Sequence, residues 1–234
     1  MDKVSNPLQA CKNIFFKPNG VFTAIEDTHN WSWLPFFIVL ATSILPVYLY
    51  FDFVDLQWYT QLIIDTSYAD ISPAEQDAIR SNMTQEQMPL VTSFMMFFSL
   101  IISNAIVATY LNITAKMDEE CVQGFTDWYG FSWWTSMPGV INSLIAVLVI
   151  LLASDTQLSP ITINPTSLAY LFNIDMASDW FTVLQSIRID TFWTMYLVTV
   201  GLSRWTKIAA RKTYIIAIAP YVIIWGVWAL TIVL

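Results

Sequence analysis

The chain has 234 residues, of which 56% are hydrophobic and only 12% are charged, and its formal net charge is −8. Soluble domains carry about twice this share of charged residues, so the composition excludes an ordinary cytosolic enzyme and a disordered tail. The negative charge also excludes a protein that binds the phosphate backbone of nucleic acid, and eleven Trp, ten Tyr and fifteen Phe are typical of a membrane protein with aromatic residues at both interfaces.

The N-terminal stretch, residues 5–30, predicts two short amphipathic helices that lie in the membrane interface. Pro7 and Pro18 divide the stretch, and each piece has an apolar stripe at helical spacing but is too short to span a bilayer. Charged residues interrupt the apolar ones and no small-residue cleavage pattern follows, so the stretch is not a secretory signal. His29, the single histidine, stands near Trp31 and is expected in the headgroup layer.

Five segments are apolar and long enough to predict transmembrane helices, since a spanning helix needs about 20 mostly apolar residues. Four of them carry no charge except at an end, whereas the fourth in order reaches spanning length only by including Arg188 and Asp190. Prolines within the segments, such as Pro138, predict kinks, which membrane bundles tolerate. The predicted spans are residues 33–53, 90–115, 131–153, 180–202 and 214–234.

The distribution of Lys and Arg predicts a cytoplasmic N-terminus and an outward C-terminus. In this orientation, eight of the ten basic residues fall on the inside, and Arg80 is the one that falls clearly outside. An excess of basic residues in cytoplasmic segments is the strongest sequence indicator of orientation. The eight inside residues are Lys3, Lys12, Lys17, Lys116, Arg204, Lys207, Arg211 and Lys212.

The segment between the first two spans is long and acidic. Ser72 followed by Pro73 and Glu75 forms a capping box with Pro at the first helical position, and Thr84 opens a second box of the same kind. One or two short helices are therefore predicted on the outer surface. The carboxylates of this segment do not follow the spacing of a calcium loop, which favours a solvated surface.

The sequence lacks the usual signatures of catalysis. A single histidine excludes a histidine-clustered metal site, and no nucleophile elbow or glycine-rich phosphate loop is present. Cys11 and Cys121 fall on the cytoplasmic side, and their spacing supports neither a disulfide nor a zinc site. We therefore expect no enzymatic activity, no catalytic residue, no cofactor and no metal.

Asp190 is the most informative single residue, because an ionisable group within a span is costly and is a functional-site hypothesis by default. On a continuous helix, Ser186, Asp190 and Thr194 share one face, while Arg188 points elsewhere and can reach the outer boundary. Two interpretations stay open: these groups fix helix packing, or they handle an ion, a proton or a ligand. The candidate intramembrane site consists of Asp190, Ser186, Thr194, Asn104, Asn142 and Arg188.

The densest basic cluster follows the fourth predicted span. If the connection to the last span is helical, three of its members share a face. The cluster either anchors the chain by the positive-inside rule or binds anionic lipid headgroups, at about 1 kcal/mol per charge. Its members are Arg204, Lys207, Arg211 and Lys212.

Short motifs along nearly the whole chain match a known family. They are Asn6-Pro7, Ile14-Phe15-Phe16-Lys17-Pro18 with Val21-Phe22, Trp33-Leu34-Pro35, Ser72-Pro73-Ala74-Glu75-Gln76, Ser136-Met137-Pro138, Asn164-Pro165-Thr166-Ser167-Leu168 and Asp190-Thr191-Phe192-Trp193. In these motifs the chain resembles the bacterial branch of the Yip-domain family. The resemblance implies one membrane domain over residues 1–234, with five helices, a cytosolic N-terminus and no catalysis. The eukaryotic relatives take part in vesicle traffic, a role that does not transfer to a bacterial cell.

Residues and resemblance together predict an all-α integral protein of the bacterial inner (plasma) membrane. Its expected role is a non-enzymatic scaffold or organiser that binds membrane lipids or partner membrane proteins, with a homo-oligomer as one form and no nucleic acid as partner. The alternative is a small transporter or channel whose pathway uses Asp190, Asn104 and Asn142.

Overall fold

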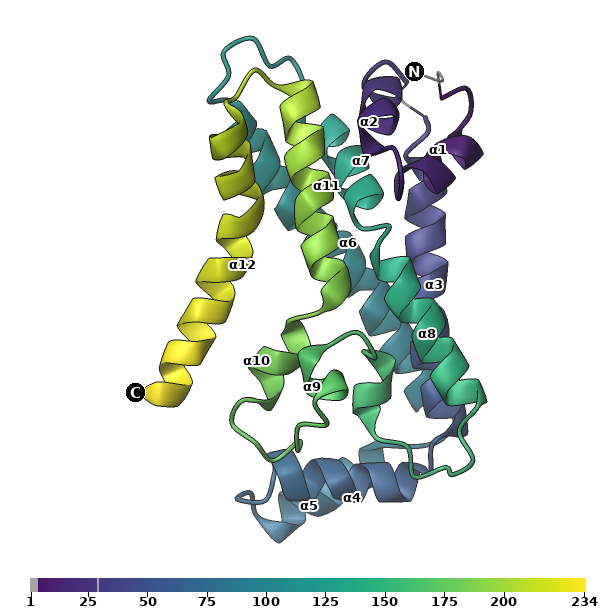
Figure 1. Cartoon of the computed structure of the whole chain (residues 1–234). Coiled ribbons are helices and arrows are strands. Elements are labelled where there is room, and N and C mark those ends of the chain that lie inside the picture. The colour runs from purple at the N-terminus through teal and green to yellow at the C-terminus, as the bar shows by residue number, and fades with distance from the viewer. Residues whose placement is uncertain (1–3, 29) are drawn as a thin grey trace. The chain divides into compact units, whose positions relative to one another are not determined.

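The computed structural model describes residues 4–28 and 30–234, and over these residues the regular structure is helical, with one isolated β-bridge. The all-α class is therefore confirmed, whereas Lys3 and His29 lie outside the described residues. The helices are α1 Pro7–Asn13, α2 Pro18–Glu26, α3 Trp33–Phe53, α4 Leu56–Ser67, α5 Pro73–Asn82, α6 Met88–Ala115, α7 Phe125–Thr135, α8 Gly139–Leu151, η1 Pro160–Ile163, α9 Leu168–Leu171, α10 Phe181–Ser186, α11 Ile189–Trp205 and α12 Ala210–Val233 (Figure 1).

The chain divides into two compact units, each assembled from segments far apart in sequence. Unit 1 comprises Met1–Ala41, Ser99–Ile141 and Asp190–Leu234, and unit 2 comprises Thr42–Phe98 and Asn142–Ile189. The long helices α3 and α6 each contribute one end to unit 1 and the other to unit 2.

Within the described residues, α3, α6 and α12 are each long and apolar enough to cross a membrane, and α7 with α8 forms a fourth crossing if the bent pair acts as one. Three predicted spans therefore correspond to single helices, with the first matching α3 at both ends. Most of α6 and α12 is not buried by protein. Exposed apolar helix faces are what lipid contact requires, because the bilayer replaces protein as the apolar environment.

The third predicted span, residues 131–153, is not one straight helix. Its helical part begins earlier, at Phe125, where the Gly124 N–H donates to the Asp127 carboxylate over 2.8 Å. The chain then bends by 42° between α7 and α8. Pro138 lies in this break, lacks a backbone N–H and disfavours helical geometry in the residue before it, which accounts for the interruption.

The prediction that residues 180–202 form one continuous helix is wrong. The helix α10 ends at Ser186, and Ile187 is extended at φ −87° and ψ 102°. The backbone there pairs with an earlier segment: the Leu168 N–H donates to the Ile187 carbonyl over 2.9 Å, and the Ile189 N–H donates to the Thr166 carbonyl over 3.1 Å. Since these bonds satisfy groups that a continuous helix would satisfy internally, α11 begins only at Ile189.

In unit 1, the two predicted N-terminal helices are present as α1 and α2, but the apolar stripe of α2 faces protein rather than lipid. Val21, Phe22 and Ile25 are buried. The Phe22 ring lies 5.0 Å from that of Phe131, and the Trp205 indole N–H donates to the Phe22 carbonyl over 2.9 Å. The stripe therefore closes an aromatic core formed with α7 and α11.

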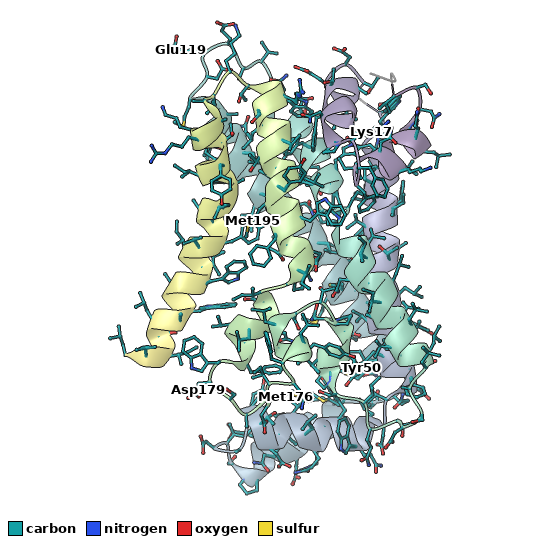
Figure 2. All side chains as sticks on the ribbon, in the orientation of Figure 1. Lys17, Tyr50, Glu119, Met176, Asp179 and Met195 are labelled. Carbon is teal, nitrogen blue, oxygen red and sulfur yellow. The ribbon has the colours of Figure 1, made fainter. Side chains whose placement is uncertain are left out.

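In unit 2, a smaller core surrounds Tyr50, whose hydroxyl donates to the Leu158 carbonyl over 2.7 Å (Figure 2). The segment between α3 and α6 supplies α4 and α5, which run across the end of α3 (Figure 1). The capping box of Ser72 and Glu75 is confirmed, with both reciprocal bonds formed. The second box does not begin a separate helix, because residues 84–87 form a turn that leads directly into α6.

Replacement of Gly201 tests the aromatic core of unit 1. A Cβ on Gly201 in α11 would overlap the buried ring of Phe131, whereas a Cβ on Gly226 in α12 would meet nothing within 4 Å. Gly201→Ala is expected to lower the free energy of unfolding by about 1–3 kcal/mol through overpacking. Thermal unfolding in detergent measures this, with Gly226→Ala as the matched control, expected to be neutral or stabilising. Equal midpoints for the two variants would contradict the packing described.

Candidate functional site

Asn104, predicted as a mid-span polar residue, holds the break between α7 and α8 in unit 1. Its side chain is buried, its Nδ2 donates to the Leu100 carbonyl over 3.0 Å, and its Oδ1 accepts a 3.2 Å bond from Ser136 Oγ. Ser136 is the residue at which α7 ends. Both ends of the Asn104 amide are therefore occupied by structural hydrogen bonds.

Asn142 plays the corresponding part in unit 2. It lies near the start of α8, is 4% exposed, and binds the loop that precedes α9. Its Oδ1 accepts from the Thr166 backbone N–H over 3.2 Å and from the Thr166 hydroxyl over 2.7 Å, and its Nδ2 lies 3.3 Å from the Ile163 carbonyl. One amide thus satisfies three polar groups of a loop that has little regular structure of its own.

Arg188 belongs to the same loop cluster rather than standing free. It forms an antiparallel bridge with Ser167, and its Nη1 lies 3.5 Å from Asn164 Oδ1. Ser186 closes α10 by donating to the Val183 carbonyl over 2.7 Å. The predicted stripe of Ser186, Asp190 and Thr194 is therefore interrupted, because the break at Ile187 separates Ser186 from the helix that carries the other two.

Asp190 lies in the first turn of α11, one residue after the helix begins. Its side chain is 6% exposed and is engaged by a neighbouring group. A carboxylate at a helix N-terminus is stabilised by the helix dipole and the unpaired backbone N–H groups. Thr194 follows one turn later on the same face and is half-buried. Because the break at Ile187 makes Asp190 part of a helix start, its burial has a structural explanation.

The residues of the basic cluster do not share one helix face in the structure. Residues 206–209 are not helical, so the expected shared face of Arg204, Lys207 and Arg211 does not form. Arg204 donates to Asn19 Oδ1 over 2.8 Å. Lys207 forms an ion pair with Glu120, in the loop after α6 whose tip carries Glu119 (Figure 2).

Asp118, in the same loop, fixes the connection between α11 and α12. Its Oδ2 accepts from the Lys207 backbone N–H over 2.7 Å, and its Oδ1 accepts from the Glu120 N–H over 3.1 Å. These two bonds hold the pKa of the Asp118 carboxyl below its usual value. Within the described residues, Arg211 and Lys212 are exposed and make no side-chain bond, so they are the members of the cluster that can reach a ligand.

One feature of unit 1 was not predicted from the sequence. A groove of about 570 Å³ opens between the end of α2, the start of α3 and the segment 122–133, and we term it the aromatic groove. The dense aromatic run of α7 was a possible signal, but the groove needs α2 and α3 beside it, which the sequence pattern does not position. Its lining includes Glu26, Trp33, Phe36, Asp127, Tyr129, Trp133 and Trp205.

Comparison with family models matches the chain to the Yip1 domain over residues 12–232. Comparison with curated proteins and with solved structures finds no match. The matched range takes in α2 to α12 and most of α1, so it covers both units and all the candidate polar residues.

The loop anchored by Asn142 yields a test of its structural role. Asn142→Ala is expected to lower the free energy of unfolding by about 1–3 kcal/mol, because the buried Thr166 N–H loses its partner. A double-mutant cycle with Thr166→Val, measured by thermal unfolding, should give a coupling energy on the order of 1 kcal/mol. Hydrogen exchange in residues 160–168 should accelerate in Asn142→Ala. Strictly additive effects would show that the two side chains do not interact.

Proposed function

Because the chain belongs to the Yip1 domain family, we propose that it is a non-enzymatic, multi-pass membrane protein that organises its bilayer by binding lipids and partner membrane proteins. The family is not known as enzymatic. Apolar helices of spanning length support the membrane location.

The proposed topology has five crossings, with α3, α6, the α7–α8 pair, α11 and α12 as the membrane segments. The 17 residues of α11 would extend about 26 Å, somewhat less than the hydrocarbon thickness of about 30 Å. The distribution of basic residues supports a cytoplasmic N-terminus and an outward C-terminus, which in a bacterium is the periplasmic side of the inner membrane.

The observation that carries the proposal is the state of the buried polar side chains. Asn104 and Asn142 are each hydrogen-bonded through both the amide nitrogen and the amide oxygen to groups of the protein, and Arg188 is bound to its own loop. Groups that bind a passing substrate need vacant donors or acceptors, whereas groups that fix packing do not. The arrangement therefore favours a rigid membrane body over a transport pathway.

The lipid-facing helices offer the surface for partners. On α12, Thr213, Ile216 and Ala217 are buried, all in its first two turns. Beyond them the helix leans away from α11 (Figure 1). Its apolar side chains there, such as Ile223 and Val227, are exposed. We propose that lipids or other membrane proteins, including a second copy of the chain, pack against this face, and that Arg211 and Lys212 hold anionic headgroups at its cytoplasmic end.

A flux measurement separates this role from the transporter alternative. Purified protein in liposomes is expected to give no proton or ion flux above that of empty liposomes. Asp190→Asn should then lower thermal stability by on the order of 1 kcal/mol, since it removes a charge from the start of α11, and should leave flux unchanged. Asp179→Asn, which changes an exposed carboxylate, is the matched control. Wild-type flux that a folded Asp190→Asn protein loses would establish the transporter and refute the scaffold.

A further inference from the structure

The aromatic groove of unit 1 has the dimensions of a small-molecule site. Its volume of about 570 Å³ lies within the range of about 300–1,000 Å³ that is usual for ligand pockets. It is formed by four separate stretches of unit 1, which supply Ile25, Trp33, Tyr129 and Trp205 among others. A groove assembled in this way has walls that are fixed by the packing of the unit.

The walls are a connected series of aromatic rings. The centroids of Trp33 and Phe36 are 5.4 Å apart with planes at 82°, and those of Phe36 and Trp133 are 4.8 Å apart at 78°. Tyr129 continues the series at 5.9 Å and 88° from Trp133. Edge-to-face contacts of this kind are favoured between aromatic rings, and Trp33 is the most exposed ring of the series.

Trp33 and Trp133 differ in a way that suits a binding site. Trp33 is 61% exposed and stands at the rim, whereas Trp133 is buried. The Trp133 indole N–H makes no hydrogen bond within the described part of the chain, and it interacts with the Tyr129 hydroxyl only outside hydrogen-bond geometry. The buried Trp133 ring therefore contributes apolar surface to the groove, while Trp33 supplies an accessible ring.

The charge of the groove has one sign. Glu26 and Asp127 are its charged lining residues, and no Lys or Arg is found among the described residues that line it. Asp127 is fixed by the bond that its Oδ2 accepts from the Gly124 N–H, and Glu26 by a 3.4 Å contact with Gln123 Nε2. Partial burial and the nearby Asp27 raise the pKa of Glu26 above its usual value, as expected for a carboxylate that no basic group offsets.

We propose that the aromatic groove binds an organic ammonium group. Aromatic faces attract a cation through their quadrupoles, and sets of aromatic residues around a quaternary ammonium are an established recognition mode. The carboxylates of Glu26 and Asp127 add the opposite charge at the mouth. The same two carboxylates repel an anionic ligand, and a purely apolar one would leave both without a counter-charge.

Two sources can supply this chemistry: the ethanolamine or choline headgroup of a membrane lipid, or a free amine in solution. The inference does not rest on the proposed function, because the site would take an ammonium group in a scaffold and in a transporter alike.

The first arm of the test uses choline and tetramethylammonium as probes. They are added to the full-length protein in a non-ionic detergent, and binding is followed by saturation-transfer NMR. Glu26→Gln and Trp33→Leu should each weaken binding about tenfold, and both alter exposed side chains, so the fold is preserved. The matched controls are Glu119→Gln, with the same charge change outside the groove, and Trp228→Leu, which makes the same ring replacement at an exposed Trp on α12 that does not line it. Both should bind like the wild type.

The second arm identifies the source. Native mass spectrometry of protein released from nanodiscs of mixed phosphatidylethanolamine and phosphatidylglycerol shows which lipid is retained. Retention of phosphatidylethanolamine that is lost in Glu26→Gln, together with weaker choline binding in these nanodiscs, assigns the lipid headgroup. Choline binding that is unchanged by phosphatidylethanolamine assigns a free amine, and both results support the site. Failure of both probes to bind the wild type in detergent, or equal binding by the groove variants and their controls, would overturn the proposal.

Discussion

The structure depends on one constraint: a buried backbone that leaves helical geometry must have its N–H and carbonyl groups satisfied by other protein groups. The two breaks in the chain follow this rule. Asn104 clamps the end of α7 through Ser136. At Ile187, the backbone pairs with residues 166–168 instead of continuing as a helix. Helix breaks of this kind are stable only where a polar group can hydrogen-bond the freed backbone groups. The buried polar side chains and the helix breaks therefore depend on each other.

This link changes the meaning of an intramembrane polar residue. A charge or amide inside a span suggests a functional site when the helix is assumed to be continuous. Here Asn142 holds a loop and Asp190 stands at a helix start, and both positions have a structural explanation. The groups that we propose for ligand binding lie elsewhere, in the aromatic groove and at Arg211 and Lys212. The candidate functional surfaces of the protein are thus at the ends of its helices rather than along their middle.

Hydropathy and capping patterns were sufficient to predict the elements that depend on local sequence. The bounds of α3 and the capping box of α5 are examples, since apolar length and side-chain caps act within a few residues. The break at Ile187 was not predictable, because its cause is a segment some 20 residues earlier. The stripe of α2 was assigned to lipid for the same reason: apolar spacing shows that a face is buried but not whether lipid or Phe131 buries it. The aromatic run of α7 was the one local signal for the aromatic groove, which also requires α2, α3 and Trp205 beside it.

The central claim is that the chain crosses the membrane five times despite its two helix breaks, with α11 as the fourth crossing. Reporter fusions at Asp179, at Lys207 and at Leu234 test it most directly, since periplasmic alkaline phosphatase and cytoplasmic fluorescent protein are each active on one side alone. The fusions at Asp179 and Leu234 are predicted to report the periplasm, and the fusion at Lys207 the cytoplasm. If Asp179 and Lys207 report the same side, α11 does not cross, and the five-crossing topology is contradicted.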